Sequence, residues 1–269
     1  MISSPEIQIL IAVLAALALM TALWFVRRRT NNAGIVDAGW AAAIGMLAVF
    51  FAITSDGYLS RRILVAALVA AWAARLSHYI LTDRVLGRPE EGRYVALRKE
   101  WGAAAERRLF FFYQSQALFA VFFALPALVV AHHSRSLWTG WDLAGVLLWV
   151  CGVGNTIASD RQLARFRVRP ESRGKTCRAG WWRYSRHPNY FFEWLHWWAY
   201  AALAAGTAFW WIAWLVPLVL LYLFFKVTGI PPTEAQALAS RGEDYRRYQR
   251  TTSVFIPWFP QKENPDEHS

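Results

Sequence analysis

The sequence predicts an all-α, polytopic membrane protein with seven transmembrane helices, its N-terminus outside and its C-terminus in the cytoplasm. Composition is the first observation: 56% of the 269 residues are hydrophobic and 16 are tryptophan, which is typical of a membrane protein. The second is a series of apolar segments close to the ~20 residues that a spanning helix needs. The third is the placement of positive charge. We therefore treat residues 1–269 as a single integral-membrane domain.

The apolar segments follow one another along the whole chain. They cover residues 6–26, 34–54, 63–82, 109–131, 141–158, 190–205 and 208–228. The first is expected to be a retained anchor, because a signal peptide carries its positive charge before the apolar run, whereas here Glu6 precedes it and Arg27, Arg28 and Arg29 follow. Only Gly206 and Thr207 separate the last two segments, so 190–228 can also be divided elsewhere.

Positive charge alternates along the chain with the same period. The segments 27–33, 83–108, 159–189 and 229–269 hold 24 of the 29 Lys and Arg residues. Seven spans with the N-terminus outside place all four segments in the cytoplasm, as the positive-inside rule requires. The net charge of +11 is then mostly a topology signal, and no nucleic-acid partner is needed to explain it.

Several enzyme classes lack support in the sequence. The two cysteines, Cys151 and Cys177, fall in a predicted span and a predicted loop and form no disulfide or metal-binding pattern. The chain has no CxxC, HExxH, P-loop or GxGxxG motif. A zinc enzyme, an ATPase and a Rossmann dehydrogenase are therefore unsupported, and no metal is predicted.

Polar residues inside the spans are the candidates for a site, because burying them in a membrane is costly. They lie on, or directly beside the ends of, the second, third, fifth and sixth segments: Asp37; Arg75, His78, Tyr79 and Thr82; Asn155, Ser159 and Asp160; and Asn189, Glu193, His196 and Tyr200. The last four share one helix face. Each set also has a structural explanation: Asp37 as a helix cap, Tyr79 as an interfacial ring, and His196 and Tyr200 as packing groups.

Two stretches near the C-terminus carry a family resemblance. "SRHPNYFFEW" and "EAQALASRGEDYRRYQRTTSVFIPW" resemble the C-terminal signature of the membrane steroid 5α-reductase family. The pattern covers about the last 120 residues, and the resemblance implies that 109–260 carries the family's cofactor-binding signature. Sterol reductases and isoprenylcysteine carboxyl methyltransferases share parts of it. The signature therefore defines a fold better than a reaction.

The resemblance implies a seven-helix bundle that binds NADPH on its cytoplasmic side. It assigns phosphate contacts to Arg167 and Lys175 and a further cofactor contact to Arg88, in "GRP". Arg offers a planar fork and Lys a point charge for phosphate oxygens. The other positions that it places at the cofactor are Asp160, Asn189, Tyr190, Glu193, Glu234, Tyr245 and Tyr248.

The stretch "SHYILTDRVLGRP" resembles the third-helix segment of steroid 5α-reductases. The resemblance implies that Tyr79 donates a proton to a substrate ketone. The family's partner for this Tyr is a Glu preceded by Gln on the second helix, whereas here the candidate is Asp37 preceded by Val36. This departure leaves the register and role of Asp37 open.

The implied activity is NADPH-dependent reduction of the C=C bond of a lipophilic enone, such as a 3-oxo-Δ4 steroid, to the 5α-dihydro product. The substrate would enter from the membrane lipids, and no obligate protein partner is evident. The expected location is a bacterial inner membrane, or the endoplasmic reticulum membrane in a eukaryote.

A SAM-dependent methyltransferase of the isoprenylcysteine type is the alternative activity. A non-catalytic membrane scaffold is the third class, but it leaves the buried polar faces unexplained.

Overall fold

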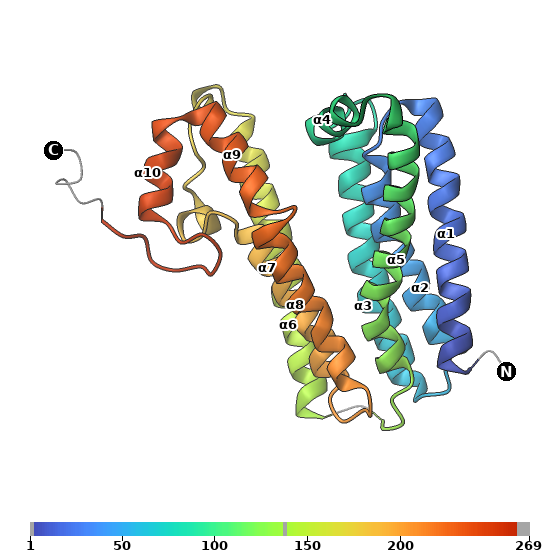
Figure 1. Ribbon diagram of the computed structural model, residues 1–269. Coiled ribbons are helices and arrows are strands. Elements are labelled where there is room, and N and C mark those ends of the chain that lie inside the picture. The colour runs from blue at the N-terminus through green and yellow to red at the C-terminus, as the bar shows by residue number, and fades with distance from the viewer. Residues whose placement is uncertain (1–2, 137–138, 263–269) are drawn as a thin grey trace. The chain divides into compact units, whose positions relative to one another are not determined.

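The computed structural model describes residues 3–136 and 139–262 of the chain (Figure 1). Helices make up 78% of it, and the described residues contain no strand. The ends of the predicted domain, residues 1–2 and 263–269, lie outside the described part. The predicted all-α architecture is therefore confirmed.

Six helical stretches among the described residues are long and apolar enough to cross a membrane. They are Pro5–Thr30, Ile35–Thr54, Leu59–Val85, Gly92–Ala131, Gly140–Arg167 and Trp210–Arg241. The predicted segment 190–205 corresponds to a helix of 16 residues, Pro188–Leu203, which is not among the six. The structure is thus that expected of a polytopic membrane protein.

The chain divides into two compact units. Unit 1 comprises residues 1–139 and 204–213, and unit 2 comprises residues 140–203 and 214–269.

Unit 1 is built on four long helices that run side by side (Figure 1). They are α1 (Pro5–Thr30), α2 (Ile35–Thr54), α3 (Leu59–Ile80) and α5 (Ala105–Ala131). The short helices η1 (Leu81–Val85), α4 (Gly92–Trp101) and η2 (Gly102–Ala104) connect α3 to α5. The core contains an aromatic cluster in which the ring of Trp40 lies 6.3 Å from Trp72 and 5.1 Å from Phe123.

Polar side chains tie the helices of unit 1 together at both ends. At one end Gln8 donates from Nε2 to Thr54 Oγ1 (2.8 Å) and accepts from His132 Nε2 (2.8 Å). At the other end the guanidinium of Arg27 binds both carboxylate oxygens of Glu106, at 2.7 and 2.8 Å. These contacts join α1 to α2 and α5 at places where the bundle would otherwise leave polar groups without partners.

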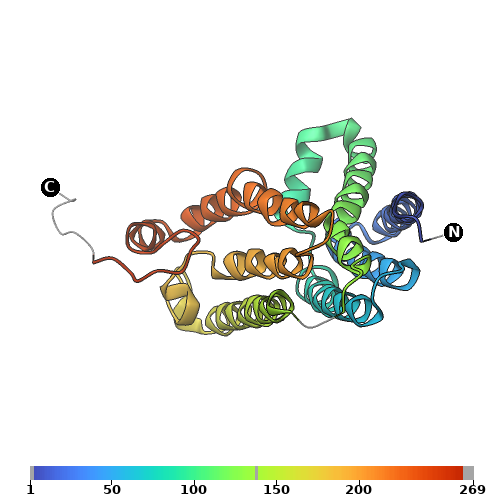
Figure 2. The same cartoon turned by 90° about the horizontal axis from the view of Figure 1, so that it is seen from below.

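Unit 2 consists of three long helices followed by a polar, helical C-terminal part. The long helices are α6 (Gly140–Arg167), α7 (Pro188–Leu203) and α8 (Trp210–Lys226). The shorter helices are η3 (Pro170–Ser172), η4 (Gly180–Arg183), α9 (Ile230–Arg241) and α10 (Glu243–Thr251). Helix α7 lies between α6 and α8, as seen along the helices in Figure 2. The indole of Trp194 on α7 donates to the carbonyl of Pro217 on α8 (3.0 Å).

Glycine allows α6 and α7 to approach each other closely. A Cβ atom added to Gly152 would lie 2.6 Å from the Cβ of His196 and 2.7 Å from its backbone nitrogen. Two residues further along α6, a Cβ added to Gly154 would meet nothing within 4 Å. The α6–α7 contact therefore depends on Gly152 and not on Gly154.

We expect Gly152→Ala to destabilise the purified protein by about 1–3 kcal/mol, because the new methyl group has to push α7 away from α6. Gly154→Ala should be neutral or slightly stabilising, since Ala has the higher helix propensity. Thermal unfolding in detergent compares the two variants. Equal midpoints for both would show that the close approach at Gly152 is not important for stability.

Candidate functional site

A single carboxylate in unit 2 organises the residues of the C-terminal signature. Glu234 on α9 accepts hydrogen bonds from Arg186 Nε (2.7 Å), His187 Nε2 (3.2 Å), Tyr245 OH (3.2 Å) and Gln249 Nε2 (2.8 Å). Because an ionised carboxylate only accepts, Nε2 of His187 carries the proton. Glu234 therefore links the segment before α7 to both α9 and α10.

Arg186 extends this network to the last turn of α10 and the residues that follow it. Its Nη1 donates to the carbonyls of Gln249 (2.9 Å) and Thr252 (2.8 Å), and its backbone nitrogen donates to Ser253 (2.8 Å). Sequence reasoning did not propose Arg186 or His187 as site residues. The signal was their position directly before Pro188, the first residue of α7. A cation there can pair with Glu234, the first residue of the C-terminal signature.

The N-terminus of α7 gathers three of the predicted cofactor residues. Asn189 donates from Nδ2 to Asp160 Oδ1 on α6 (3.3 Å), and its Oδ1 accepts from the backbone of Tyr190 (3.1 Å). The ring of Tyr190 stacks against His187 at 5.4 Å and Phe224 at 4.8 Å. Asp160, Asn189 and Tyr190 thus lie together beside the Glu234 network.

The rest of the polar stripe on α7 turns towards α6. Nδ1 of His196 contacts the carbonyl oxygen of Glu193 (2.5 Å), and Tyr200 OH accepts from Trp149 Nε1 of α6 (3.2 Å). His196 and Tyr200 are buried, whereas Asn189 and Glu193 are half-buried. Of the four residues, only Asn189 and Glu193 therefore keep exposed surface.

The loop between α6 and α7 is held on α6 by two tryptophans. The indole of Trp181 donates to Asn155 Oδ1 (3.0 Å), and the indole of Trp182 donates to the carbonyl of Ser159 (2.9 Å). The polar face predicted at Asn155 and Ser159 therefore anchors this loop.

The predicted phosphate contacts lie on exposed parts of unit 2. Arg167 ends α6, and Lys175 lies in the following loop; both are exposed. Two residues on, Cys177 is buried, and burial raises the pKa of its thiol. The loop is attached to α10 by Asp244, which accepts from the backbone of Thr176 (2.7 Å) and from Arg178 (3.2 Å).

The two tyrosines of α10 are buried and use their hydroxyl groups internally. Tyr245 donates to Glu234, and Tyr248 donates to the backbone carbonyls of Trp182 and Ser185, the latter at 2.9 Å. Burial raises the pKa of both phenols, so they remain neutral donors at physiological pH. Both residues hold α10 against the segment that leads into α7.

In unit 1, Asp37 has different partners from the one that the resemblance implies. Its carboxylate binds Arg93 Nη2, and the hydroxyl of Tyr94 lies 3.1 Å from each of its oxygens. Tyr79 is half-buried in the last turn of α3, where the guanidinium of Arg75 lies 5.6 Å from its ring centre. Arg88 is exposed in the loop before α4. Sequence reasoning missed Arg93 and Tyr94, which follow "EEG" in a charged segment read only as a topology signal.

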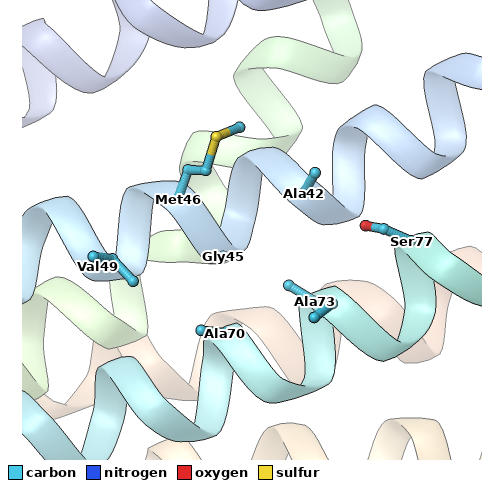
Figure 3. Close-up of a pocket in the computed structure, with 8 residues that line it drawn as sticks. Ala42, Gly45, Met46, Val49, Ala70, Ala73 and Ser77 are labelled. Carbon is cyan, nitrogen blue, oxygen red and sulfur yellow. The ribbon is translucent and has the colours of Figure 1, made fainter.

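A groove runs along the outside of unit 1 between α2 and α3 (Figure 3). Its volume is about 410 Å³, and it is lined by Ala42, Gly45, Met46, Val49, Ala70, Ala73, Ala74 and Ser77. Gly45 faces Ala73 so closely that an added Cβ would lie 2.6 Å from that of Ala73. Ser77 is the one polar side chain among these lining residues, and its hydroxyl already donates to the carbonyl of Ala38 (3.0 Å). The groove therefore offers an apolar surface to lipids or a lipophilic molecule.

The comparisons with known proteins give one family. Neither the curated proteins nor the solved structures include one that matches this chain. A family model described as "Protein of unknown function (DUF1295)" matches residues 23–252, which is most of the chain. The protein therefore belongs to the DUF1295 family.

Proposed function

We propose that this protein is an NADPH-dependent reductase that saturates the C=C bond of a lipophilic enone, with a 3-oxo-Δ4 steroid as the preferred substrate class. The observation that carries the proposal is the polar cluster around the N-terminus of α7. There Asn189 and Asp160 pair, and the Glu234 network fixes the segment that leads into the helix. The resemblance to membrane steroid 5α-reductases rests on these same signature residues.

The residues of unit 2 suit a nucleotide-containing cofactor. The N-terminus of a helix favours anionic groups, and the segment 159–189 holds nine Lys and Arg residues. Arg167 and Lys175 are exposed and would bind phosphate oxygens. Asn189, Tyr190 and Glu193 would contact the amide or ribose groups. Bound NADPH would supply the hydride that saturates the double bond.

In unit 1, Tyr79 would donate a hydrogen bond to the substrate carbonyl. Reduction of an enone gathers negative charge on that oxygen, and a fixed donor there stabilises the transition state more than the ground state. Asp37 would orient this donor or the substrate. The apolar groove between α2 and α3 gives a lipophilic substrate a surface to approach from the bilayer.

A SAM-dependent methyltransferase of the isoprenylcysteine type is the second candidate, because that group shares the RHPxY region and the following Glu. It has no need for a carbonyl-facing tyrosine or for cations that bind a pyrophosphate and a 2′-phosphate. The nucleotide that the protein binds decides between the two.

We further propose seven membrane crossings, with the N-terminus outside and a bacterial inner membrane as the location. Helix α7, with 16 residues, would be the sixth of these seven crossings, packed between α6 and α8. Reporter fusions after Gly57 and His133 should behave as extracytoplasmic, and fusions after Arg173 and at the C-terminus as cytoplasmic. Opposite locations for the Arg173 and C-terminal fusions would contradict seven crossings.

We expect Tyr79→Phe to lower turnover about a hundred- to a thousand-fold with little change in NADPH affinity, because the lost donor acts only on developing charge. Tyr58→Phe, which removes an exposed hydroxyl at the start of α3, is the matched control and should leave turnover unchanged. The assay follows NADPH oxidation with testosterone or progesterone and identifies the saturated ketone. Undiminished turnover of Tyr79→Phe would remove Tyr79 from the reaction.

A further inference from the structure

We propose that Arg93 and Tyr94 are positioning residues for Asp37 in the reductase reaction. This inference rests on the proposed function and adds two residues that the resemblance does not point to. Helix α4 returns to the beginning of α2, where Asp37 lies in the first turn.

The carboxylate of Asp37 is held from two directions. Arg93 binds Oδ2 through Nη2, and the hydroxyl of Tyr94 lies 3.1 Å from both Oδ1 and Oδ2. The same Nη2 donates to the hydroxyl oxygen of Tyr94 (2.9 Å). Since that oxygen accepts from Arg93, the phenol proton is directed at Asp37. The three groups form a closed hydrogen-bonded triangle with one cation and one anion.

The two partners of Asp37 are themselves fixed. Tyr94 is fully buried, and its ring packs edge-on against Phe112 of α5 at 6.1 Å. The guanidinium of Arg93 lies 4.6 Å from the ring centre of Tyr94, and its Nε is 3.4 Å from Glu91 Oε1. Rotating the Asp37 carboxylate would therefore break several contacts at once.

Asp37 and Tyr79 lie on two helices that are joined close to both residues. Ser77 donates to the carbonyl of Ala38 (3.0 Å), which ties α3 to α2 one residue after Asp37 and two residues before Tyr79. The side chain of Asp37 remains 23% exposed, so one side of the carboxylate can still meet a ligand. A carboxylate that is accessible and cannot turn is suited to orienting a donor or a substrate.

A purely structural ion pair would look similar, and α4 provides the control for it. Arg98, one turn further along the same helix, pairs with Glu90 and contacts the carbonyl of Asn31 rather than Asp37. Arg98→Gln therefore removes an ion pair that attaches α4 without disturbing the Asp37 triangle.

The test compares Arg93→Gln, Arg93→Lys, Tyr94→Phe and Arg98→Gln for thermal midpoint, NADPH affinity and turnover of testosterone. We expect Arg93→Gln and Tyr94→Phe to lower kcat about ten- to a hundred-fold with NADPH affinity within twofold of the parent. Arg93→Lys should recover part of the loss, because the charge remains while the fork is lost. Arg98→Gln should lower only the midpoint.

Coupling to Asp37 is measured with the double variant Asp37→Asn/Arg93→Gln. Turnover equal to that of Asp37→Asn alone supports the inference, since both changes then act through one carboxylate. Undiminished kcat in Arg93→Gln and Tyr94→Phe would overturn it, and so would equal kcat losses in Arg93→Gln and Arg98→Gln. These results leave the reductase itself intact. A parent protein that reduces no enone would instead remove the proposed function, and this inference with it.

Discussion

The membrane interior offers no partner to a polar group, and the arrangement of unit 1 follows from that constraint. Several of its polar side chains are paired near the two ends of the four long helices, and between the ends Gln114 of α5 donates to Thr21 of α1 (3.2 Å). One end holds the contacts of Gln8 with Thr54 and His132, and the other holds the Arg27–Glu106 pair and the triangle around Asp37. Along the helices, the ring of Trp40 packs against Trp72 and Phe123, and Gly45 of α2 closely approaches Ala73 of α3. A reaction on a lipophilic substrate would then take place where apolar surface and fixed polar groups meet.

Unit 2 shows what the signature residues do in the structure. The segment that leads into α7 is joined to α9 and α10 by the contacts of Arg186 and His187 with Glu234. The hydroxyl of Tyr245 donates to Glu234, and that of Tyr248 donates to the carbonyl of Ser185, so both also hold these elements together. A pattern of this kind identifies a fold, because changing any member leaves a buried partner unpaired. That explains how families with different reactions can share it. The groups left for a ligand are those at the surface, above all Arg167 and Lys175.

Hydropathy and charge were sufficient to predict the long apolar helices, because both depend on local composition, whereas the polar helices α4, α9 and α10 were not predicted. The expected segment 34–54 matches α2 within one residue, whereas α6 extends nine residues beyond the expected 158 through a charged stretch with no apolar signal. The contacts of Asp37 could not be predicted in this way. Arg93 and Tyr94 are more than fifty positions away, and only the return of α4 brings them to α2. Glu234 gave a comparable result: its position was found from the signature, but its partners Arg186 and His187 appeared only in the fold.

Binding of nucleotides to the purified, detergent-solubilised protein tests the central claim most directly. The account predicts that the protein binds NADPH, that it binds NADH more weakly if Arg167 or Lys175 contacts the 2′-phosphate, and that replacing either cation by Gln weakens NADPH binding. Isothermal titration of NADPH, NADH and SAM provides the comparison in one preparation. Binding of SAM without binding of NADPH would contradict the reductase account and assign the polar cluster at α7 to a methyltransferase.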